Sequence, residues 1–296
     1  MSPHLTPPPR RALALTGPGL AFPASLVVLL VVLAPMLLLL LGSLRADATP
    51  GTDAASGYTL ANYALFFTDA YYHRVLFDTL WVSAVCTLAA LLLGFPVAYF
   101  LARTQSPRKS LFIVLLVFPL MVGGVVRAAG WMVILGNAGI VNAVLTGLGL
   151  SEAPVKLLYT PLAVILGTTG VVLPYLILAL QSVLEGIDFS VEEAAQNLGA
   201  NFFTTFWRVL LPIAAPGVAA GTVLVFILCM NAYATPVLLG GTGLTMMAPA
   251  LYDQITKAAN WGFGSALAWV LVTVTLAMAV LSNGFIHRRY RRTMGG

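Results

Sequence analysis

Charged side chains are scarce in this chain. Asp, Glu, Lys and Arg together supply 8% of its 296 residues, whereas hydrophobic residues supply 59% and the mean hydropathy is +0.94. A soluble protein of this length needs far more polar surface to cover itself. The scarcity of charge therefore excludes an ordinary soluble domain and predicts an integral membrane protein.

Residues that carry chemistry are also few. The two cysteines, Cys86 and Cys229, lie in apolar segments, so we expect small buried hydrophobic side chains rather than a disulfide or a metal pair. The histidines are scattered, without metal-ligand spacing or a serine or cysteine partner in evident reach: His4, His73 and His287. We find no catalytic constellation and predict neither a metal site nor an enzymatic activity.

A phosphate-binding loop of the form G-x-x-x-x-G-K-[ST] is missing as well, so we do not expect the chain to cradle ATP in that manner. The net charge of +5 could suggest a nucleic-acid partner. However, the basic residues stand at the ends of apolar runs rather than on one face, which predicts no nucleic-acid binding. We interpret them as topology signals.

Long apolar runs, in contrast, are abundant, and they predict an all-α protein with six membrane-spanning helices. A spanning helix needs about 20 apolar residues, and the expected spans are residues 24–44, 75–102, 110–135, 160–184, 213–239 and 263–286. A cleaved signal peptide is the rival interpretation of the first span, but the run Leu26–Leu41 exceeds the usual length of about 7–15 residues. Around this transmembrane domain, residues 24–286, we expect a disordered cytoplasmic N-terminus over residues 1–23 and a basic cytoplasmic tail over residues 287–296.

The basic residues predict the orientation of these spans. Ten fall on the side that holds both termini: Arg10, Arg11, Arg103, Arg108, Lys109, Arg208, Arg288, Arg289, Arg291 and Arg292. Only four fall on the other side, namely Arg45, Arg74, Lys156 and Lys257, and Arg127 lies within a span. Because cytoplasmic loops carry the excess of Lys and Arg, both termini and the loop over residues 185–212 are predicted to be cytoplasmic.

That loop contains a polar stretch, Ser190–Pro212, which predicts two short helices meeting at a glycine. Ser190 and Glu193 have the Ser-x-x-Glu spacing of a capping box, in which both side chains bond backbone N–H groups at a helix start. Gly199 stands where a helix would end in the left-handed conformation that glycine adopts cheaply. We expect the second helix to run over residues 201–211 and to stop at Pro212.

The residues of this stretch also resemble a known signature. Glu193-Ala194-Ala195, Gly199, Val209 and Leu211-Pro212 are spaced as in the EAA motif of ABC importer permeases, with Val in the usual Ile position. In that family the loop is the coupling helix, which docks in a cleft of the cytoplasmic ATPase subunit. The resemblance implies the type I ABC importer permease fold, with six transmembrane helices and a cytoplasmic coupling hairpin.

Further stretches look like the spermidine/putrescine-type permeases, and the B-type rather than the C-type. They are Leu60–Tyr63, Gly94–Tyr99 with Ala102-Arg103, Phe118-Pro119, Arg127, Trp131, Ile134–Gly136, Thr235–Gly241 and Trp261–Ala266. The resemblance implies a permease of the bacterial inner membrane that binds no cofactor itself. It also implies a second permease subunit, two copies of an ATPase that uses ATP, an extracytoplasmic solute-binding protein and a polyamine substrate.

Candidate pathway and docking residues follow from polar or aromatic groups in unusual places. The pathway candidates are Arg127, Trp131, Asn231 and Tyr233, and the candidates for contact with the binding protein are Asp253 and Trp261. An arginine inside a span costs about 2.5–3.5 kcal/mol on insertion scales, which favours a function for Arg127. Alternatively, Arg127 reaches the outer interface beside Trp131, and Asn231 and Tyr233 only bond neighbouring helices.

Other functions stay open at this point. One is an ABC importer permease for a small anionic or zwitterionic solute, because the expected spans hold no deep carboxylate for a polyamine and Arg127 would repel a cation. Another is a free-standing secondary transporter or channel, which would not copurify with an ATPase. A membrane-embedded enzyme is a third, more distant alternative.

Overall fold

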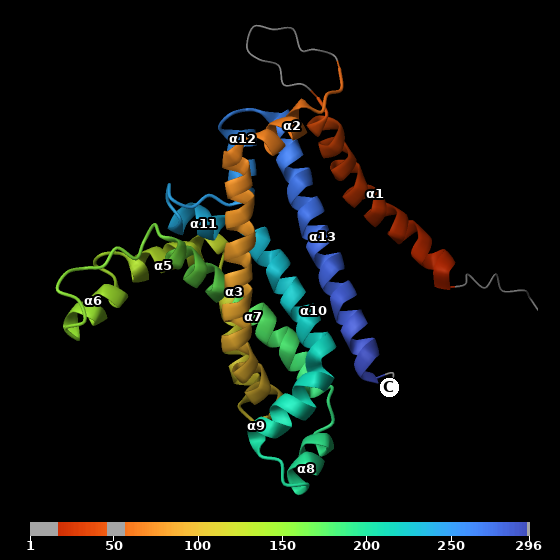
Figure 1. Ribbon diagram of the computed structural model, residues 1–296, viewed down its shortest axis with the longest axis vertical. Helices are drawn as coiled ribbons and strands as arrows, with labels where there is room; N and C mark the ends of the chain where they lie inside the picture. The colour runs from red at the N-terminus through yellow and green to blue at the C-terminus, as the bar shows by residue number, and fades with distance from the viewer. Residues whose placement is uncertain (1–16, 46–56, 295–296) are drawn as a thin grey trace, which may run out of the picture.

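The computed structural model describes residues 17–45 and 57–294, and all regular elements of the described part are helices, with a single isolated β-bridge between Arg45 and Tyr58 (Figure 1). The helices are α1 (Gly17–Ser43), α2 (Ala61–Thr68), α3 (Ala70–Arg103), α4 (Lys109–Met121), α5 (Gly124–Leu135), α6 (Ile140–Gly147), α7 (Pro161–Glu185), α8 (Ser190–Asn197), α9 (Phe202–Thr205), α10 (Leu211–Met230), α11 (Ala234–Leu239), α12 (Met247–Thr256) and α13 (Trp261–Met294). A π-turn, Phe206–Leu210, joins α9 to α10.

The core of the bundle lies where α3, α7 and α10 pack together. Apolar burial drives helices together only weakly in lipid, so close packing at small residues is the main source of attraction. A Cβ atom on Gly94 of α3 would lie 3.3 Å from Ile177 Cγ1, and one on Gly221 of α10 would lie 3.4 Å from Ala179 Cβ. Cys86 and Cys229 are buried in this core as free thiols, as the sequence predicts.

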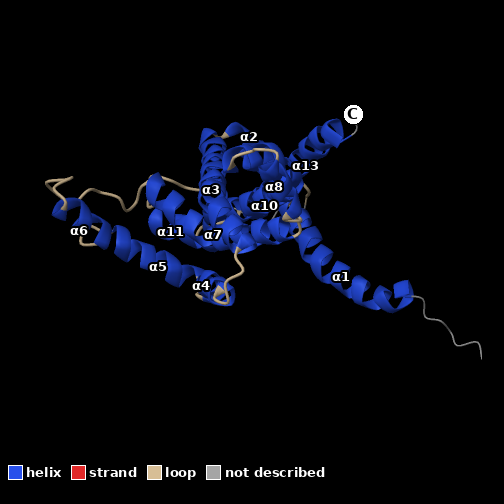
Figure 2. Ribbon diagram, turned by 90° about the horizontal axis from the view of Figure 1, so that it is seen from below, coloured by secondary structure: helices blue, strands red, loops and turns tan. Residues whose placement is uncertain are grey.

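The flanking helices leave the core in two directions (Figure 2). The arm α4–α5–α6 extends to one side, and α1, which packs on α13 near α2, extends to the other. From Ser25 onward the side chains of α1 are mostly exposed, for example Val28 at 63% and Leu38 at 69%. Such apolar exposure is typical of a surface that faces lipid or another transmembrane helix.

Within residues 17–45 and 57–294, six segments are long and apolar enough to cross a membrane: Ser25–Ser43, Ala70–Arg103, Gly124–Gly147, Pro161–Glu185, Phe202–Met230 and Trp261–Ser282. Two of the expected spans are interrupted in the structure. The span 110–135 breaks between α4 and α5, because Val122 and Gly123 are extended, with ψ of 130° and 145°. The span 213–239 breaks after Met230, where the chain leaves the helix before the short α11.

The ends of the predicted domain also differ from the structure. Residues 17–23 belong to α1 rather than to a disordered segment, and residues 1–16 lie outside the described part. The expected tail continues α13 as a helix as far as Met294, while residues 295–296 are not described. The second span begins earlier than expected, at Ala70, because the Asp69 carboxylate accepts the Tyr71 N–H at 2.8 Å and caps the helix.

Candidate functional site

The hairpin formed by α8 and α9 lies at one end of the bundle, and α2 and α12 lie at the opposite end (Figure 1). Its first helix is not started by the predicted capping box, because Ser190 is already helical and the N-cap residue is Phe189, which makes no side-chain cap hydrogen bond. Instead, Asp188 Oδ1 accepts the Ser190 N–H at 2.9 Å, the Asx-turn that aspartate commonly forms. This bond holds the pKa of the exposed Asp188 carboxyl below its usual value.

The turn between the two helices is the predicted one. Gly199 has a φ of +87°, in the left-handed region, which confirms the expectation for this residue. The Gly199 N–H donates to Gln196 O at 2.9 Å and the Ala200 N–H to Ala195 O at 3.1 Å, which closes the end of α8. The amide oxygen of Asn201 then accepts the Thr204 N–H at 2.8 Å and starts α9.

The second helix does not stop at Pro212, so that prediction is wrong. The chain stays helical from Phe202 to Met230. Within it, the Leu211 N–H bonds to Phe206 O, five residues earlier, and Pro212 occupies the first turn of α10. A proline lacks the N–H of an internal helical residue and crowds the carbonyl four residues before it. The π-turn beside it is a known way for a helix to accommodate such a disturbance.

The two adjacent glutamates of α8 have different surroundings. Glu193, the residue that matches the motif, is exposed, whereas Glu192 is only 2% exposed. Glu192 Oε1 lies 2.5 Å from the NH2 atom of Arg103, and the Tyr99 hydroxyl donates to Glu192 Oε2 at 2.8 Å. Sequence reasoning missed this cluster. Adjacent side chains on a helix point about 100° apart, so one of two neighbouring glutamates can face the bundle while the other faces outward. This geometry could have indicated the cluster from the sequence.

Arg103 also holds the chain that enters the hairpin. Its NH1 atom donates to Ile187 O at 3.1 Å, and its guanidinium lies 5.6 Å from the centre of the Phe189 ring. Breaking a buried ion pair on one side leaves an unpaired charge and is strongly unfavourable, by about 3–5 kcal/mol in measured cases. The last turn of α3 therefore fixes the position of α8.

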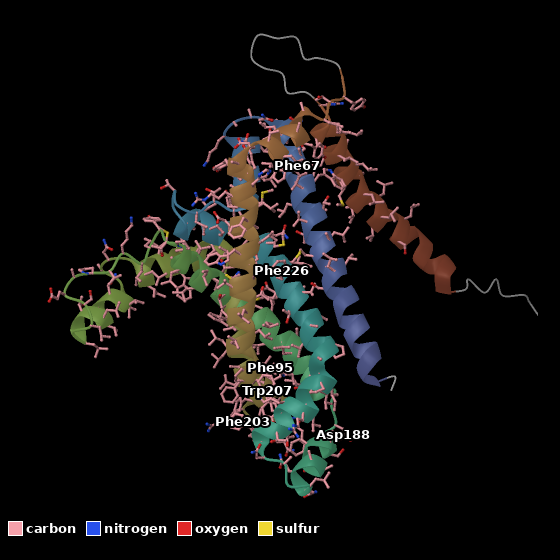
Figure 3. All side chains as sticks on the ribbon, viewed as in Figure 1. Phe67, Phe95, Asp188, Phe203, Trp207 and Phe226 are labelled. Atoms are coloured by element: carbon pink, nitrogen blue, oxygen red, sulfur yellow. The ribbon has the colours of Figure 1, made fainter. Side chains whose placement is uncertain are left out.

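Aromatic packing attaches the second half of the hairpin to α3 as well. The rings of Phe95 and Phe206 meet edge to face at 5.1 Å, and those of Tyr99 and Phe202 at 5.8 Å. An apolar groove of about 590 Å³ lies along this junction, and Phe203 and Trp207 are among the residues that line it. Both lie at the hairpin end of the bundle (Figure 3). The hairpin is thus held by polar contacts at α8 and by aromatic contacts at α9.

The remaining motif residues lie on the outer side of the hairpin or on the helix that follows. Glu193, Ala194 and Gly199 are exposed and Ala195 is half-buried. Val209 and Leu211 are half-buried, and Pro212 is exposed. Leu198, beside the glycine, is 90% exposed. An apolar side chain so fully exposed at a protruding tip indicates a surface that contacts another molecule.

The pathway candidates on α5 have different roles in the structure. Trp131 packs on α7, where a Cβ atom on Gly170 would lie 3.0 Å from its Cζ2 atom. Arg127 is half-buried, and its Nε and NH1 atoms are buried without a hydrogen-bond partner in the described part of the chain. Helix α5 packs against both α7 and α11, so these residues lie near the break that follows α10.

That break contains the other two pathway candidates. Asn231 is exposed and donates through Nδ2 to Ile227 O at 2.9 Å, in its own helix. Tyr233 is 37% exposed, and its ring lies 4.7 Å from that of Tyr252, which is 45% exposed and which the sequence did not single out. The structure thus brings Tyr233 to α12 and leaves Asn231 bonded within α10.

The two residues expected to meet the binding protein lie at the end opposite the hairpin. Asp253 forms an ion pair with Lys257, with 2.8 Å between Oδ1 and Nζ. This bond raises the pKa of the exposed Lys257 ammonium. Trp261 is 64% exposed at the start of α13. Both are accessible, and the structure does not bring them into contact with the hairpin.

Comparison with known proteins identifies the family. The sequence profile of the binding-protein-dependent transport system inner membrane component matches residues 87–293. The chain belongs to this family. It is 35% identical to the spermidine/putrescine transport system permease protein PotB of Haemophilus influenzae, over 75% of this chain and 77% of that protein. It is 33% identical to PotB of Escherichia coli, over 76% of this chain and 80% of that protein.

Solved structures agree on the fold. A chain of a bacterial alginate ABC transporter, solved with an alginate-bound periplasmic protein, matches with a TM-score of 0.76 at 17% identity. The match covers 92% of this chain and 94% of the other. The predicted fold, an all-α permease of the type I ABC importer class, is confirmed, as is the predicted role as an ABC importer permease of the inner membrane. The profile match spans the whole hairpin of the permease but begins within α3, after α1 and α2.

Proposed function

We propose that this permease imports polyamines such as spermidine and putrescine, and that ATP hydrolysis in a separate subunit drives the transport. The observation that carries the substrate is the identity of 33–35% with PotB proteins over three quarters of the chain. The permease itself performs no chemistry on the substrate in this proposal. It binds no cofactor, and it supplies the membrane pathway and the surface through which hydrolysis is coupled.

The proposed coupling surface is the outer side of the hairpin. Glu193, Ala194 and Leu198 are exposed there, and the left-handed Gly199 sets the angle at which α8 stands out from the bundle. Small alanines permit close approach of a partner, and the N-terminal turn of α8 favours the negative charge of Glu193. We propose that the cleft of a cytoplasmic ATPase receives this surface.

The proposed assembly contains this permease, a second permease, two ATPase copies and an extracytoplasmic solute-binding protein. Both termini and the hairpin then face the cytoplasm, where ATP is available. The opposite end, with Asp253 and Trp261, is the proposed contact for the binding protein. The exposure of both residues at that end supports this arrangement.

Two observations bear on the cargo. The pair Tyr233–Tyr252 offers exposed aromatic faces, and a cation over such a face gains about 0.5–1 kcal/mol. This weak attraction suits a pathway that must release an ammonium compound. The unpartnered N–H groups of Arg127 favour instead the alternative of a small anionic or zwitterionic solute, which they would attract. We favour a polyamine because the matches to the spermidine/putrescine permeases PotB cover about three quarters of the chain.

Uptake by the complete importer in proteoliposomes, together with its own binding protein, tests the proposal. We expect ATP-dependent, saturable uptake of labelled putrescine that unlabelled spermidine competes away. A non-hydrolysable ATP analogue serves as the control and should abolish uptake. Competition by anionic or zwitterionic compounds alone would show that the substrate is wrong while the importer assignment stands. Uptake by this chain alone, without ATP, would support the secondary transporter.

A further inference from the structure

Helix α3 carries polar contacts to other elements at both of its ends. At the hairpin end, Tyr99 and Arg103 hold the buried Glu192 of α8. In this part of the helix the contacts are charged and buried, so they fix α8 in orientation as well as in position. Any displacement of α8 must either break this cluster or move the end of α3.

At the opposite end, α3 holds α12 through hydrogen bonds. The Met247 N–H donates to Thr79 Oγ1 at 2.8 Å, with both groups buried, and Gln254 Nε2 donates to the Tyr72 hydroxyl at 3.1 Å. The Tyr72 ring also meets the Phe263 ring at 4.8 Å, at the start of α13. These contacts fix both ends of α12 against α3.

The two sets of contacts lie on one helix of 34 residues, which stays helical through the internal Pro96 between them. At 1.5 Å per residue, Thr79 and Tyr99 are about 30 Å apart along its axis. Packing against α7 and α10 supports the helix between them. Because α3 is continuous and packs on α7 and α10, we expect a displacement at one end to reach the other, whereas the loops that flank α8 and α12 provide no such path.

We propose that α3 is the link that carries movement of the coupling hairpin to α12 at the opposite end of the permease, with Glu192 as the positioning residue at which the movement enters. The inference rests on the proposed function, because it assumes an ATPase on the hairpin and a binding protein at the other end. It adds that the inward-facing Glu192, rather than the motif residue Glu193, connects the hairpin to the bundle.

The test is the stimulation of ATP hydrolysis by the loaded binding protein in the reconstituted complete importer. We expect Glu192→Gln to lower the ratio of stimulated to unstimulated hydrolysis at least fivefold, while the ATPase still copurifies with the permease. Glu185→Gln is the matched control. Glu185 also forms an ion pair, with 2.7 Å to Lys109 Nζ, near the same end, but its side chain is 40% exposed and its polar partners are Lys109 of α4 and Gln181 of α7. Its ratio should equal that of the wild type.

A second variant examines the other end of the link. Thr79→Val keeps the shape of the side chain and removes the acceptor for the Met247 N–H, so we expect the same ratio to fall. Because both changes interrupt one link, the double variant should be no worse than the more severe single variant. A merely structural role at two separate sites predicts instead that the two losses multiply. Multiplied losses, or wild-type ratios in both single variants, would overturn the proposal.

If the importer with Glu192→Gln does not assemble, a milder variant at the same cluster still tests the proposal. Tyr99→Phe removes only the hydrogen bond to Glu192 Oε2 and keeps the ring, so it should assemble. A ratio at least twofold below the wild type in this variant supports the link, and an unchanged ratio overturns it. If the wild-type complex itself shows no stimulation by its binding protein, the proposed function fails, whatever the variants do.

Discussion

Gly199 sets the turn between α8 and α9, and its backbone conformation makes a prediction at the level of a single residue. A Cβ atom added to it would meet nothing within 4 Å, so a substitution there acts through the backbone alone. The left-handed conformation costs other residues about 1–2 kcal/mol, and Asn tolerates it best. We expect ATP-driven uptake to fall in the order Gly199→Asn, Gly199→Ala, Gly199→Val, with a loss of roughly five- to thirtyfold for alanine.

The neighbouring Gly186 supplies the control for this series. Its φ of −72° suits any residue, and an added Cβ atom would lie at an ordinary 3.5 Å from Val183 O. Gly186→Ala should therefore transport as the wild type does. Equal uptake by Gly199→Val and Gly186→Ala would show that the left-handed turn is not needed for coupling.

The pair Glu192 and Glu193 shows how far single residues could be predicted. The sequence places Glu193 in the first turn of the first hairpin helix, where the structure has it, because spacing reflects the local helix. The burial of Glu192 depends on Arg103 and Tyr99, which are about 90 residues distant in the chain. Local pattern alone cannot predict a contact whose partner is chosen by the packing of α3 against the hairpin.

At the level of elements, the start of α8 makes a second prediction. Because the Asp188 carboxylate and not the Ser190 hydroxyl bonds the first helical N–H, Asp188→Ala should loosen the first turn of α8 and Ser190→Ala should not. Hydrogen exchange of the amides at residues 190–193, followed by mass spectrometry on the purified protein, measures this directly. Faster exchange in Ser190→Ala than in Asp188→Ala would contradict this prediction and would support the capping box of Ser190 and Glu193.

The same element should respond to acid. The bond from the Ser190 N–H lowers the pKa of Asp188. The charged carboxylate therefore stabilises α8 fully at every pH above the usual pKa of an aspartate, which includes neutral pH. This stabilisation is lost as the pH falls through the lowered pKa. Asp188→Asn keeps an acceptor that does not titrate, so it should retain protection at a pH where the wild type loses it.

The bounds of a helix were predicted well where they follow the length of an apolar run, and poorly where they depend on backbone geometry. The run that forms α7 gave a span within one residue of the helix Pro161–Glu185. The break at Val122–Gly123 lies inside an apolar run, and the break after Met230 begins at the polar Asn231 within an otherwise apolar run, so the average hydropathy of the runs carries little signal for either break. Pro212 predicted the end of a helix, but the π-turn before it accommodates the proline and the helix continues to Met230.

For the whole molecule, the distribution of basic residues over the two ends is the main topological evidence. Arg103, Arg108, Lys109 and Arg208 belong to the hairpin end, with the end of α3, the start of α4 and the π-turn. Arg45, Arg74 and Lys257 belong to the opposite end, with α2, α12 and the start of α3. The excess of basic charge at the hairpin end is modest in these segments, so orientation needs an independent measurement.

Labelling of single cysteines in intact cells gives that measurement. The native Cys86 and Cys229 are buried and can be replaced by alanine to provide a background without thiols. A cysteine at Ala258, exposed between α12 and α13, should react with a membrane-impermeant maleimide from outside. A cysteine at Gln105, exposed between α3 and α4 at the hairpin end, should react only after the membrane is permeabilised. The reverse pattern would place the hairpin on the side without ATP and would contradict its coupling role.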